Sequence, residues 1–182
     1  MLARFLPEFS NSRDKEVCGK GDVLEPEELG EELWMEEALR EALRALALGE
    51  VPVGAVVVHG SRVIGRGSNR NLVDHDPTAH AEIVALREAG RELGNYRLTG
   101  CEMYVTLEPC AMCAGAMVHA RLKRLVYGAD DPKAGAVQTV MQVLNHPGMN
   151  HQVEVTKGVL AGRCAEMLQS FFRDKRGVNA EE

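Results

Sequence analysis

Two short motifs carry the side chains that could do chemistry in this chain: His80-Ala81-Glu82 and Pro109-Cys110-Ala111-Met112-Cys113. An imidazole and two thiolates are preferred ligands of Zn²⁺, and three protein ligands leave the fourth tetrahedral position open for water. Glu82 then remains as a carboxylate close to that open position. The two motifs therefore predict a catalytic metal site rather than a structural one.

The spacing of these residues predicts where the metal lies. His80 and Glu82 are two positions apart and do not share a helix face, so they can approach one ion only beyond the N-terminus of their helix. Glu82 would then act as an acid–base group rather than as a ligand. Cys110 and Cys113 fall in the first helical turn after Pro109, where free N–H groups and the helix dipole favour thiolates.

The rest of the chain predicts the scaffold. We expect strands at 53–58, 62–65, 101–107, 124–127 and 153–156, and helices at 31–48, 76–93, 109–121 and 163–176, with a weak helix at 136–144. Asp76 and Pro77 look like an N-cap and a first helical residue. This order predicts an α/β fold in three layers, with a mixed five-stranded sheet flanked by helices. Both motifs would lie where a strand leads into a helix, which is a common place for sites.

Composition limits the class of protein. A chain of 182 residues with 45% hydrophobic residues fits one globular domain, and its apolar runs are too short to span a membrane. The first residues lack the sustained apolar segment of a secretory signal. Five cysteines, two of them in the metal motif, favour a reducing cytoplasm over a disulfide framework.

The net charge of −6 is unevenly distributed. Residues 1–33 hold nine acidic and four basic residues, a net charge of −5, whereas residues 34–182 have a net charge of only −1. We expect an acidic, flexible extension over 1–30, a single domain that carries both metal motifs over 31–176 and a tail over 177–182. Two basic clusters could contact phosphates, although such runs are more often solvated surface: Arg121, Lys123 and Arg124, and Arg173, Lys175 and Arg176.

The motif pair is the signature of zinc-dependent nucleobase deaminases. Longer stretches resemble the bacterial tRNA-specific adenosine deaminases: VPVGAVVV (51–58), HDPTAHAEIVALR (75–87), NYRL (95–98), YVTLEPCAMCAGAM (104–117) and NHPGMNHQVEVTKGVLA (145–161). The resemblance implies a cytidine-deaminase-like fold and hydrolytic deamination of the wobble adenosine of a tRNA anticodon to inosine. It also implies a homodimer with one Zn²⁺ per subunit.

By position, the resemblance implies three zinc ligands, His80, Cys110 and Cys113, and a proton shuttle, Glu82. It also matches Asn69 to a contact with the flipped base and Asp131 to a contact near the ribose of that base. From the residues alone, a turn residue is the favoured interpretation of Asn69, whereas a solvated loop acid and a binding residue are equally good interpretations of Asp131. Phe172 follows another phenylalanine, and the two cannot both face a core from one helix, so Phe172 could stack on a nucleotide.

Two other interpretations remain open at this point. A deaminase of a free base or nucleotide, such as guanine or deoxycytidylate, can share both motifs. A non-catalytic RNA-binding module could keep a structural zinc, but that site would have no use for Glu82. A structural zinc would also need a fourth donor, and the remaining candidates are Cys18, Cys101, Cys164, His75, His119 and His151.

Overall fold

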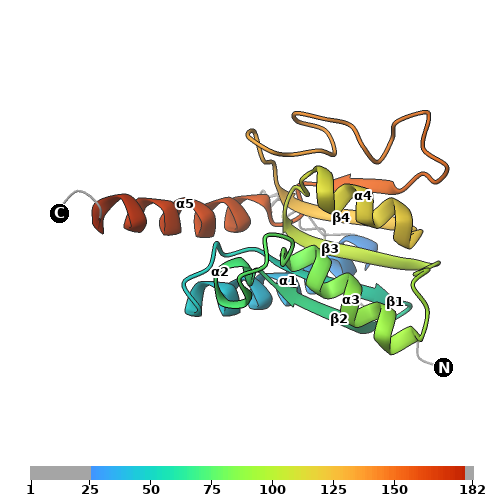
Figure 1. The fold of residues 1–182 in the computed structure, drawn as a ribbon, viewed down its shortest axis with the longest axis horizontal. Coiled ribbons are helices and arrows are strands. Elements are labelled where there is room, and N and C mark those ends of the chain that lie inside the picture. The colour runs from blue at the N-terminus through green and yellow to red at the C-terminus, as the bar shows by residue number, and fades with distance from the viewer. Residues whose placement is uncertain (1–25, 179–182) are drawn as a thin grey trace, which may run out of the picture.

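The computed structural model describes residues 26–178, which form one five-stranded sheet in the order β2-β1-β3-β4-β5 with helices on both faces (Figure 1). β1 pairs antiparallel with β2 and β3, whereas β3, β4 and β5 are parallel. This arrangement confirms the predicted mixed, cytidine-deaminase-like sheet. The strands are β1 (Gly54–His59), β2 (Arg62–Ser68), β3 (Cys101–Leu107), β4 (Arg124–Ala129) and β5 (Glu154–Lys157). The helices are α1 (Pro26–Ala47), α2 (Asn71–Asp74), α3 (Ala81–Leu93), α4 (Ala111–Ala120) and α5 (Ala161–Val178).

Strand β1 shows why the sheet is covered on both faces. Its residues from Gly54 to Val58 are apolar without interruption, and alternate side chains point to opposite faces. Ala55 and Val57 pack into the core beneath α3 and α4, whereas Val56 and Val58 pack into the core beneath α1 and α5. All four are at most 3% exposed, so the central strand supports a helical layer on each side.

Helix α3 lies unusually close to β2 because both surfaces are made of small residues. A Cβ atom added to Gly67 would lie 2.0 Å from the Ala81 carbonyl oxygen, and one added to Gly65 would lie 2.4 Å from the Ala85 carbonyl oxygen. The facing residues of α3, Ala81, Ala85 and Ala89, are fully buried. Because Gly65 and Gly67 have no side chains, the first turn of α3 packs directly on the sheet.

The helix predicted from Asp76 begins later than expected. Asp76 does not cap α3; its Oδ1 accepts hydrogen bonds from the backbone N and the Oγ1 of Thr78, both at 2.7 Å, and so forms a turn. Residues 71–74 form the short helix α2, which the sequence did not predict, and α3 starts only at Ala81. An Asp-Pro pair suits a turn as well as a helix start, so the local pattern alone placed the start too early.

Two other elements also differ from expectation. Residues 136–144 form turns instead of the weak helix: the backbone N of Val140 donates to Gly135 and that of Val143 to Ala136, so neither makes the bond to the fourth preceding residue that an α-helix needs. Helix α1 begins at Pro26 and not at 31; proline is well suited to a first helical turn. Most of the predicted acidic extension, and the last four residues of the tail, lie outside the described residues. Within 26–178, no helix has the length and apolar character needed to cross a membrane.

Candidate active site

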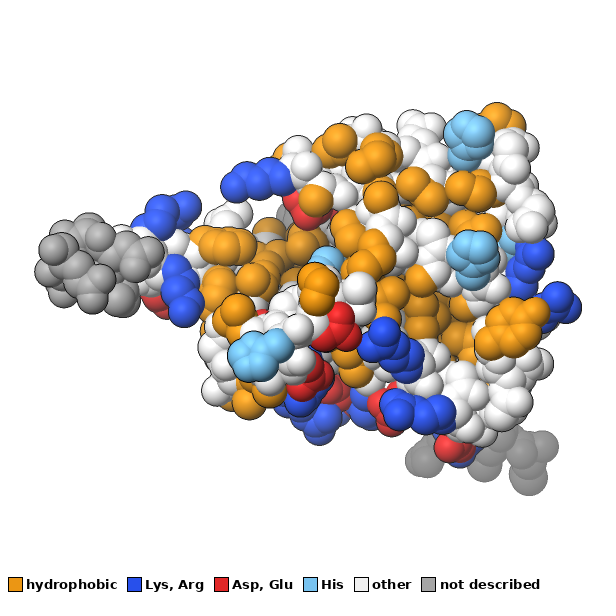
Figure 2. Space-filling model, viewed as in Figure 1, with side chains coloured by type: hydrophobic (Ala, Val, Ile, Leu, Met, Phe, Trp, Pro, Cys, Tyr) orange, Lys and Arg blue, Asp and Glu red, His pale blue; other side chains and the backbone are white. Residues whose placement is uncertain are grey.

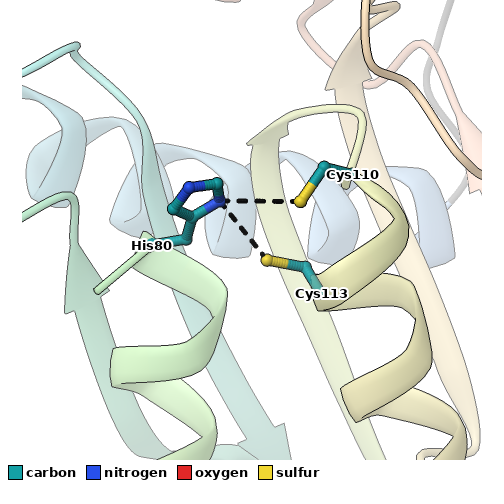
Figure 3. Close-up of side chains that lie close together, drawn as sticks. All are labelled: His80, Cys110 and Cys113. Atoms are coloured by element: carbon teal, nitrogen blue, oxygen red, sulfur yellow. Dashed lines mark hydrogen bonds between the residues drawn. The ribbon is translucent and has the colours of Figure 1, made fainter. Parts of the chain in front are cut away.

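The three predicted metal ligands meet between the N-terminal ends of α3 and α4 (Figure 3). His80 is the N-cap residue of α3, Cys110 is the N-cap residue of α4, and Cys113 lies in the first turn of α4. His80 Nδ1 is 3.7 Å from Cys110 Sγ and 3.6 Å from Cys113 Sγ. The prediction that a metal would lie beyond the helix ends therefore agrees with the positions of the three donor atoms.

The protonation states of these residues depend on each other. The pKa of Cys110 is lowered to about 3, because the Cys113 thiol and then the His80 ring hydrogen-bond to its sulfur. The pKa of Cys113 is raised by its bond to Cys110 and by burial, and the pKa of His80 is raised mainly by its bond to Cys110. Two adjacent thiolates repel one another unless a cation lies between them, so this donor set suits a divalent metal ion.

Glu82 lies in the first turn of α3 and is only 4% exposed. Burial raises its pKa, the positive charge on His80 lowers it, and the negative charge on Cys110 raises it. A carboxyl group that is buried in this way holds a proton more readily than one in water. This property suits a group that takes up and releases protons during a reaction.

Within the described residues, the cluster of His80, Cys110 and Cys113 contains no fourth protein ligand. Cys101 and Cys164 are buried elsewhere in the two cores, and His151 Nε2 lies 2.6 Å from the carbonyl oxygen of Leu122. Of the remaining candidates, His75 and His119 do not join the three donors, and Cys18 lies outside the described residues. A structural zinc is held by four protein ligands, so a cluster of three argues against the structural-zinc interpretation.

Asn69 lies directly beside the start of α3. It follows β2, is 8% exposed, and its Oδ1 accepts a hydrogen bond of 2.9 Å from the backbone N of Ala81. The amide oxygen thus satisfies one of the free N–H groups at the helix start. Asn69 Nδ2 donates to none of the described residues, which leaves it available to a substrate. Asn69 is therefore both a helix-positioning residue and a candidate binding residue.

Asp131 and Phe172 are placed very differently. Asp131 follows β4 and is half-buried; its Oδ1 accepts from the backbone N of Lys133 and of Ala134. Phe172 lies on α5, is 45% exposed, and makes an edge-to-face contact with Phe171 at 5.3 Å between ring centroids. No contact joins Phe172 to the metal cluster, and its side chain is not part of a core.

Two buried carboxylates near the site were not singled out from the sequence. Glu108 and Glu50 are each 2% exposed; Glu108 accepts a hydrogen bond from the backbone N of Asp131, and Glu50 accepts one from the backbone N of Leu72 in α2. Burial alone would raise the pKa of Glu108, but N–H donors from Gln138, Asp131 and Thr139 lower it below its ordinary value. The sequence feature that could have identified Glu108 is its position as a charged residue between an apolar strand and the Pro109-Cys110 pair.

Comparisons with known proteins agree with this geometry. The family profile of the MafB19-like deaminases matches residues 30–176. A relative from Haemophilus influenzae, named tRNA-specific adenosine deaminase, is 52% identical over 147 residues, which make up 80% of this chain and 85% of the relative. The chain belongs to this deaminase family.

Two solved structures are similar to this deaminase. One, from a study of tRNA:A34 deaminases that edit A to I at the wobble position, shares 48% identity and a TM-score of 0.73 over 75% of this chain and 99% of that one. The other, a guanine deaminase from Nitrosomonas europaea, has a TM-score of 0.68 over 88% of this chain and 98% of that one. At 22% identity, the second structure supports the fold alone.

Proposed function

We propose that this deaminase converts the wobble adenosine of a tRNA anticodon to inosine, with one Zn²⁺ held by His80, Cys110 and Cys113. The observation that carries the proposal is the meeting of these three donors beside the buried carboxyl group of Glu82. The substrate is proposed from the relatives, which include an H. influenzae protein named tRNA-specific adenosine deaminase and a solved tRNA:A34 deaminase.

The distances between the donors fit zinc. Zn–N bonds of about 2.0–2.1 Å and Zn–S bonds of about 2.3 Å, at a tetrahedral angle, separate N and S by about 3.6 Å. The observed separations are 3.6 and 3.7 Å. Zinc with three such ligands supplies a Lewis acid that allows water to ionise near neutral pH. Calcium and magnesium prefer oxygen ligands, so a set of two thiolates and an imidazole does not suit them.

Glu82 is the residue that we assign to proton transfer. In the overall reaction, water oxygen forms a bond to C6 of adenine, the bond from C6 to the amino nitrogen breaks, and ammonia leaves. The Glu82 carboxylate takes one proton from water and delivers it to the ring nitrogen N1; it then transfers the second proton, from the hydroxyl on C6, to the departing amino group, so that the C6 carbonyl forms as ammonia leaves. Its buried position excludes bulk water from these steps, and its raised pKa allows it to carry the proton.

Three further residues are proposed to bind the RNA. Asn69 would donate from its free Nδ2 to the flipped base, and Asp131 would accept from a ribose 2′-OH, which distinguishes RNA from DNA. Phe172 would stack on an unpaired nucleotide. An anticodon loop is already single-stranded, so the cost of removing the base from its stack is small.

The two basic clusters differ as candidates for phosphate contact. Arg121 donates to Asn150, Lys123 pairs with Glu102, and Arg124 pairs with Glu31, so the first cluster is occupied within the protein. The second cluster, Arg173, Lys175 and Arg176, is exposed near the end of α5, and none of its members forms an ion pair with another described residue. Helix α5 extends away from the sheet in Figure 1. We therefore propose that the second cluster binds RNA phosphates.

The proposed homodimer would use the outer face of α3 and α4. Figure 2 shows apolar side chains gathered over this face, which holds a groove lined in part by Ile83, Leu86, Tyr96 and Ala116. Tyr96 is 70% exposed although it lies among apolar neighbours. A contiguous apolar surface of this kind is typical of an interface between subunits. Light scattering of the purified protein should give twice the mass of one chain. The substitution Leu86→Arg should reduce the measured mass to that of one chain, whereas Leu43→Arg, at an exposed position of α1, should leave it unchanged.

Two smaller expectations stand with this proposal. The described cysteines at 101, 110, 113 and 164 are all free thiols, which supports a reducing cytoplasm as the site of action. The profile match over 30–176 supports one deaminase domain at 31–176, flanked by the extension at 1–30 and the tail at 177–182.

The decisive experiment is a deamination assay on an anticodon stem-loop with adenosine at the wobble position. The purified protein should convert that adenosine to inosine, and a stem-loop with guanosine or cytidine at the same position should remain unchanged. Free adenosine, guanine and dCMP serve as competing substrates. Turnover of guanine or dCMP without turnover of the stem-loop would replace this proposal with a free-base or nucleotide deaminase.

A further inference from the structure

The carboxylate of Glu108 is buried and bound by four backbone N–H groups. Oε1 accepts from Val137 at 3.1 Å, Gln138 at 2.8 Å and Thr139 at 3.1 Å, and Oε2 accepts from Asp131 at 3.1 Å. All four donors belong to one segment, 131–139, which follows β4. A single side chain thus determines the path of that segment.

Backbone donors take the place of a cation around Glu108. A buried carboxylate is costly unless charges or hydrogen bonds compensate it. Glu41, on the other face of the sheet, is 3% exposed and pairs with Arg44 and Arg66. Within 30–176, Glu108 has no such ion pair, so its charge is compensated by the 131–139 segment. If the segment moved away, the carboxylate would lose most of its hydrogen-bond donors.

The same segment also lies along the residues that lead to the metal site. The backbone N of Glu108 donates to Ala129 at 2.8 Å, and the carbonyl oxygen of Pro109 accepts from Ala136 at 2.8 Å. The metal ligand Cys110 forms an isolated β-bridge with Gly135. The 131–139 segment is therefore fixed to residues 108–110 by both side-chain and backbone hydrogen bonds.

Gly135 shows how tightly the segment surrounds the carboxylate. A Cβ atom at this position would lie 2.3 Å from Glu108 Oε2 and 2.2 Å from Thr139 Oγ1. Both distances are far below van der Waals contact, so any larger residue would force the segment and the carboxylate apart. The absence of a side chain at 135 is what allows all four N–H groups to reach Glu108.

Asp131 depends on this arrangement for its own position. Its N donates to Glu108, and its carbonyl oxygen accepts from Thr139 Oγ1 at 2.7 Å and from the N of Gly135 at 3.0 Å. The half-buried carboxylate of Asp131 is thus held at a fixed position relative to the segment that carries Cys110. This link joins a proposed RNA-binding residue to the proposed metal centre.

We propose that Glu108 is a positioning residue, which holds the 131–139 segment against the Cys110 segment so that Asp131 meets the ribose of the target nucleotide. The inference rests on the proposed function because it takes Asp131 as an RNA contact. Glu108 does not itself touch the substrate. Its contribution is to fix the distance between the group that binds the ribose and the metal centre that acts on the base.

Amide hydrogen exchange tests the holding role without any assay of activity. In Glu108→Gln, one oxygen remains to accept from 137–139, and the new NH2 group faces the N–H of Asp131. Exchange at Asp131 should therefore accelerate about tenfold or more, while 137–139 stay protected. Glu108→Ala should accelerate exchange at all four amides. Gly135→Ala should do so with Glu108 intact, because its Cβ displaces the segment.

Glu41→Gln is the matched control, since it also removes the charge of a buried carboxylate. It should leave exchange at 131–139 unchanged. Equal exchange at these amides in wild type, Glu108→Gln and Glu108→Ala would overturn the proposal. Zinc content should remain at one ion per subunit in Glu108→Gln, and loss of zinc in that variant would instead make Glu108 a support of the metal site.

A double-mutant cycle tests the connection to Asp131. Glu108→Gln and Asp131→Ala should each lower kcat/KM on the stem-loop by about tenfold or more, and the double variant should lose little beyond the worse single variant. Multiplied losses would show that Glu108 acts independently of Asp131 and would overturn the positioning role. If the wild type does not deaminate the stem-loop, the proposed function fails, and hydrogen exchange still decides whether Glu108 holds the segment.

Discussion

His80 and Cys110 are the N-cap residues of two different helices, and Nδ1 of His80 lies 3.7 Å from Sγ of Cys110. N-cap side chains commonly accept hydrogen bonds from the first turn of their own helix, but neither of these side chains does so. Both are therefore free to point toward each other. The N-terminal ends of α3 and α4 also favour negative charge, which stabilises thiolates at the same point.

Removal of the metal should destabilise the protein. A chelator such as 2,6-pyridinedicarboxylate, or the substitution Cys113→Ser, should lower the Tm and abolish deamination, because the buried donor set loses its compensating cation. Zinc added back should restore both properties to the chelated wild type but not to the variant. Cys164→Ala, at a buried thiol outside the cluster, should retain zinc. A chelated protein with wild-type Tm and activity would rule out the metal site.

Glu82→Gln should separate metal binding from catalysis. The variant should keep one zinc per subunit, whereas kcat should fall by about 10²- to 10⁴-fold because proton transfer is lost. The free energy of unfolding should stay the same or increase, since the buried Glu82 carboxyl group lies in a site that burial makes costly for its charge. Glu92→Gln, at an exposed position of the same helix, should have wild-type activity. Near wild-type turnover by Glu82→Gln would contradict the assigned role.

Gly67→Ala should disturb the site through the backbone. A Cβ atom there would lie 2.0 Å from the Ala81 carbonyl oxygen, so α3 must move away from β2 and take His80 with it. We expect a loss of about 1–3 kcal/mol in unfolding free energy, together with weaker zinc binding. Gly162→Ala in α5, where an added Cβ meets no atom within 4 Å, should be neutral or slightly stabilising. Denaturant unfolding and a zinc competition assay would measure both effects.

Elements that depend only on their own residues were predicted correctly from the sequence, whereas elements that depend on distant contacts were not. The apolar run at Cys101–Leu107 predicted β3 with its observed bounds, because a buried strand needs only its own residues. The start of α3 was wrong because it depends on Asn69, whose Oδ1 accepts from Ala81 twelve positions along the chain. The helix predicted at 136–144 failed for a similar reason: this segment folds around Glu108, whose carboxylate accepts from Val137 although it lies 29 positions earlier in the chain.

Chemical patterns predicted the composition of the site better than its support. The residue types of His80, Cys110 and Cys113 predicted a common set of metal donors, and the structure brings the three donor atoms together. Their convergence could not be derived from spacing, because it depends on α3 and α4 starting side by side on the same edge of the sheet. The role of Glu108 was hidden for a physical reason: its partners are backbone groups, which are the same for any residue type.

Replacement of Asn69 by aspartate should cost less unfolding free energy than replacement by alanine, but both replacements should lower activity. Asn69→Asp keeps an oxygen that accepts from the N of Ala81, so its unfolding free energy should match the wild type, whereas Asn69→Ala should lose about 1 kcal/mol. Both variants lack the Nδ2 donor, and both should have a lower kcat/KM on the stem-loop. An Asn69→Asp variant with full activity would assign Asn69 to the support of α3 alone. Thermal unfolding and initial rates measure the two effects separately.

Phe172→Ala should weaken RNA binding with little effect on the fold. The side chain is 45% exposed, so its removal should change the unfolding free energy by less than about 1 kcal/mol. Stacking of one base contributes about 1–3 kcal/mol, so its loss should raise the Kd for the stem-loop about 5- to 150-fold. Leu43→Ala, which removes a 52% exposed apolar side chain from α1, is the matched control and should leave the Kd unchanged. Fluorescence anisotropy at fixed salt measures both variants, and an equal Kd for Phe172→Ala and wild type would exclude Phe172 from the RNA interface.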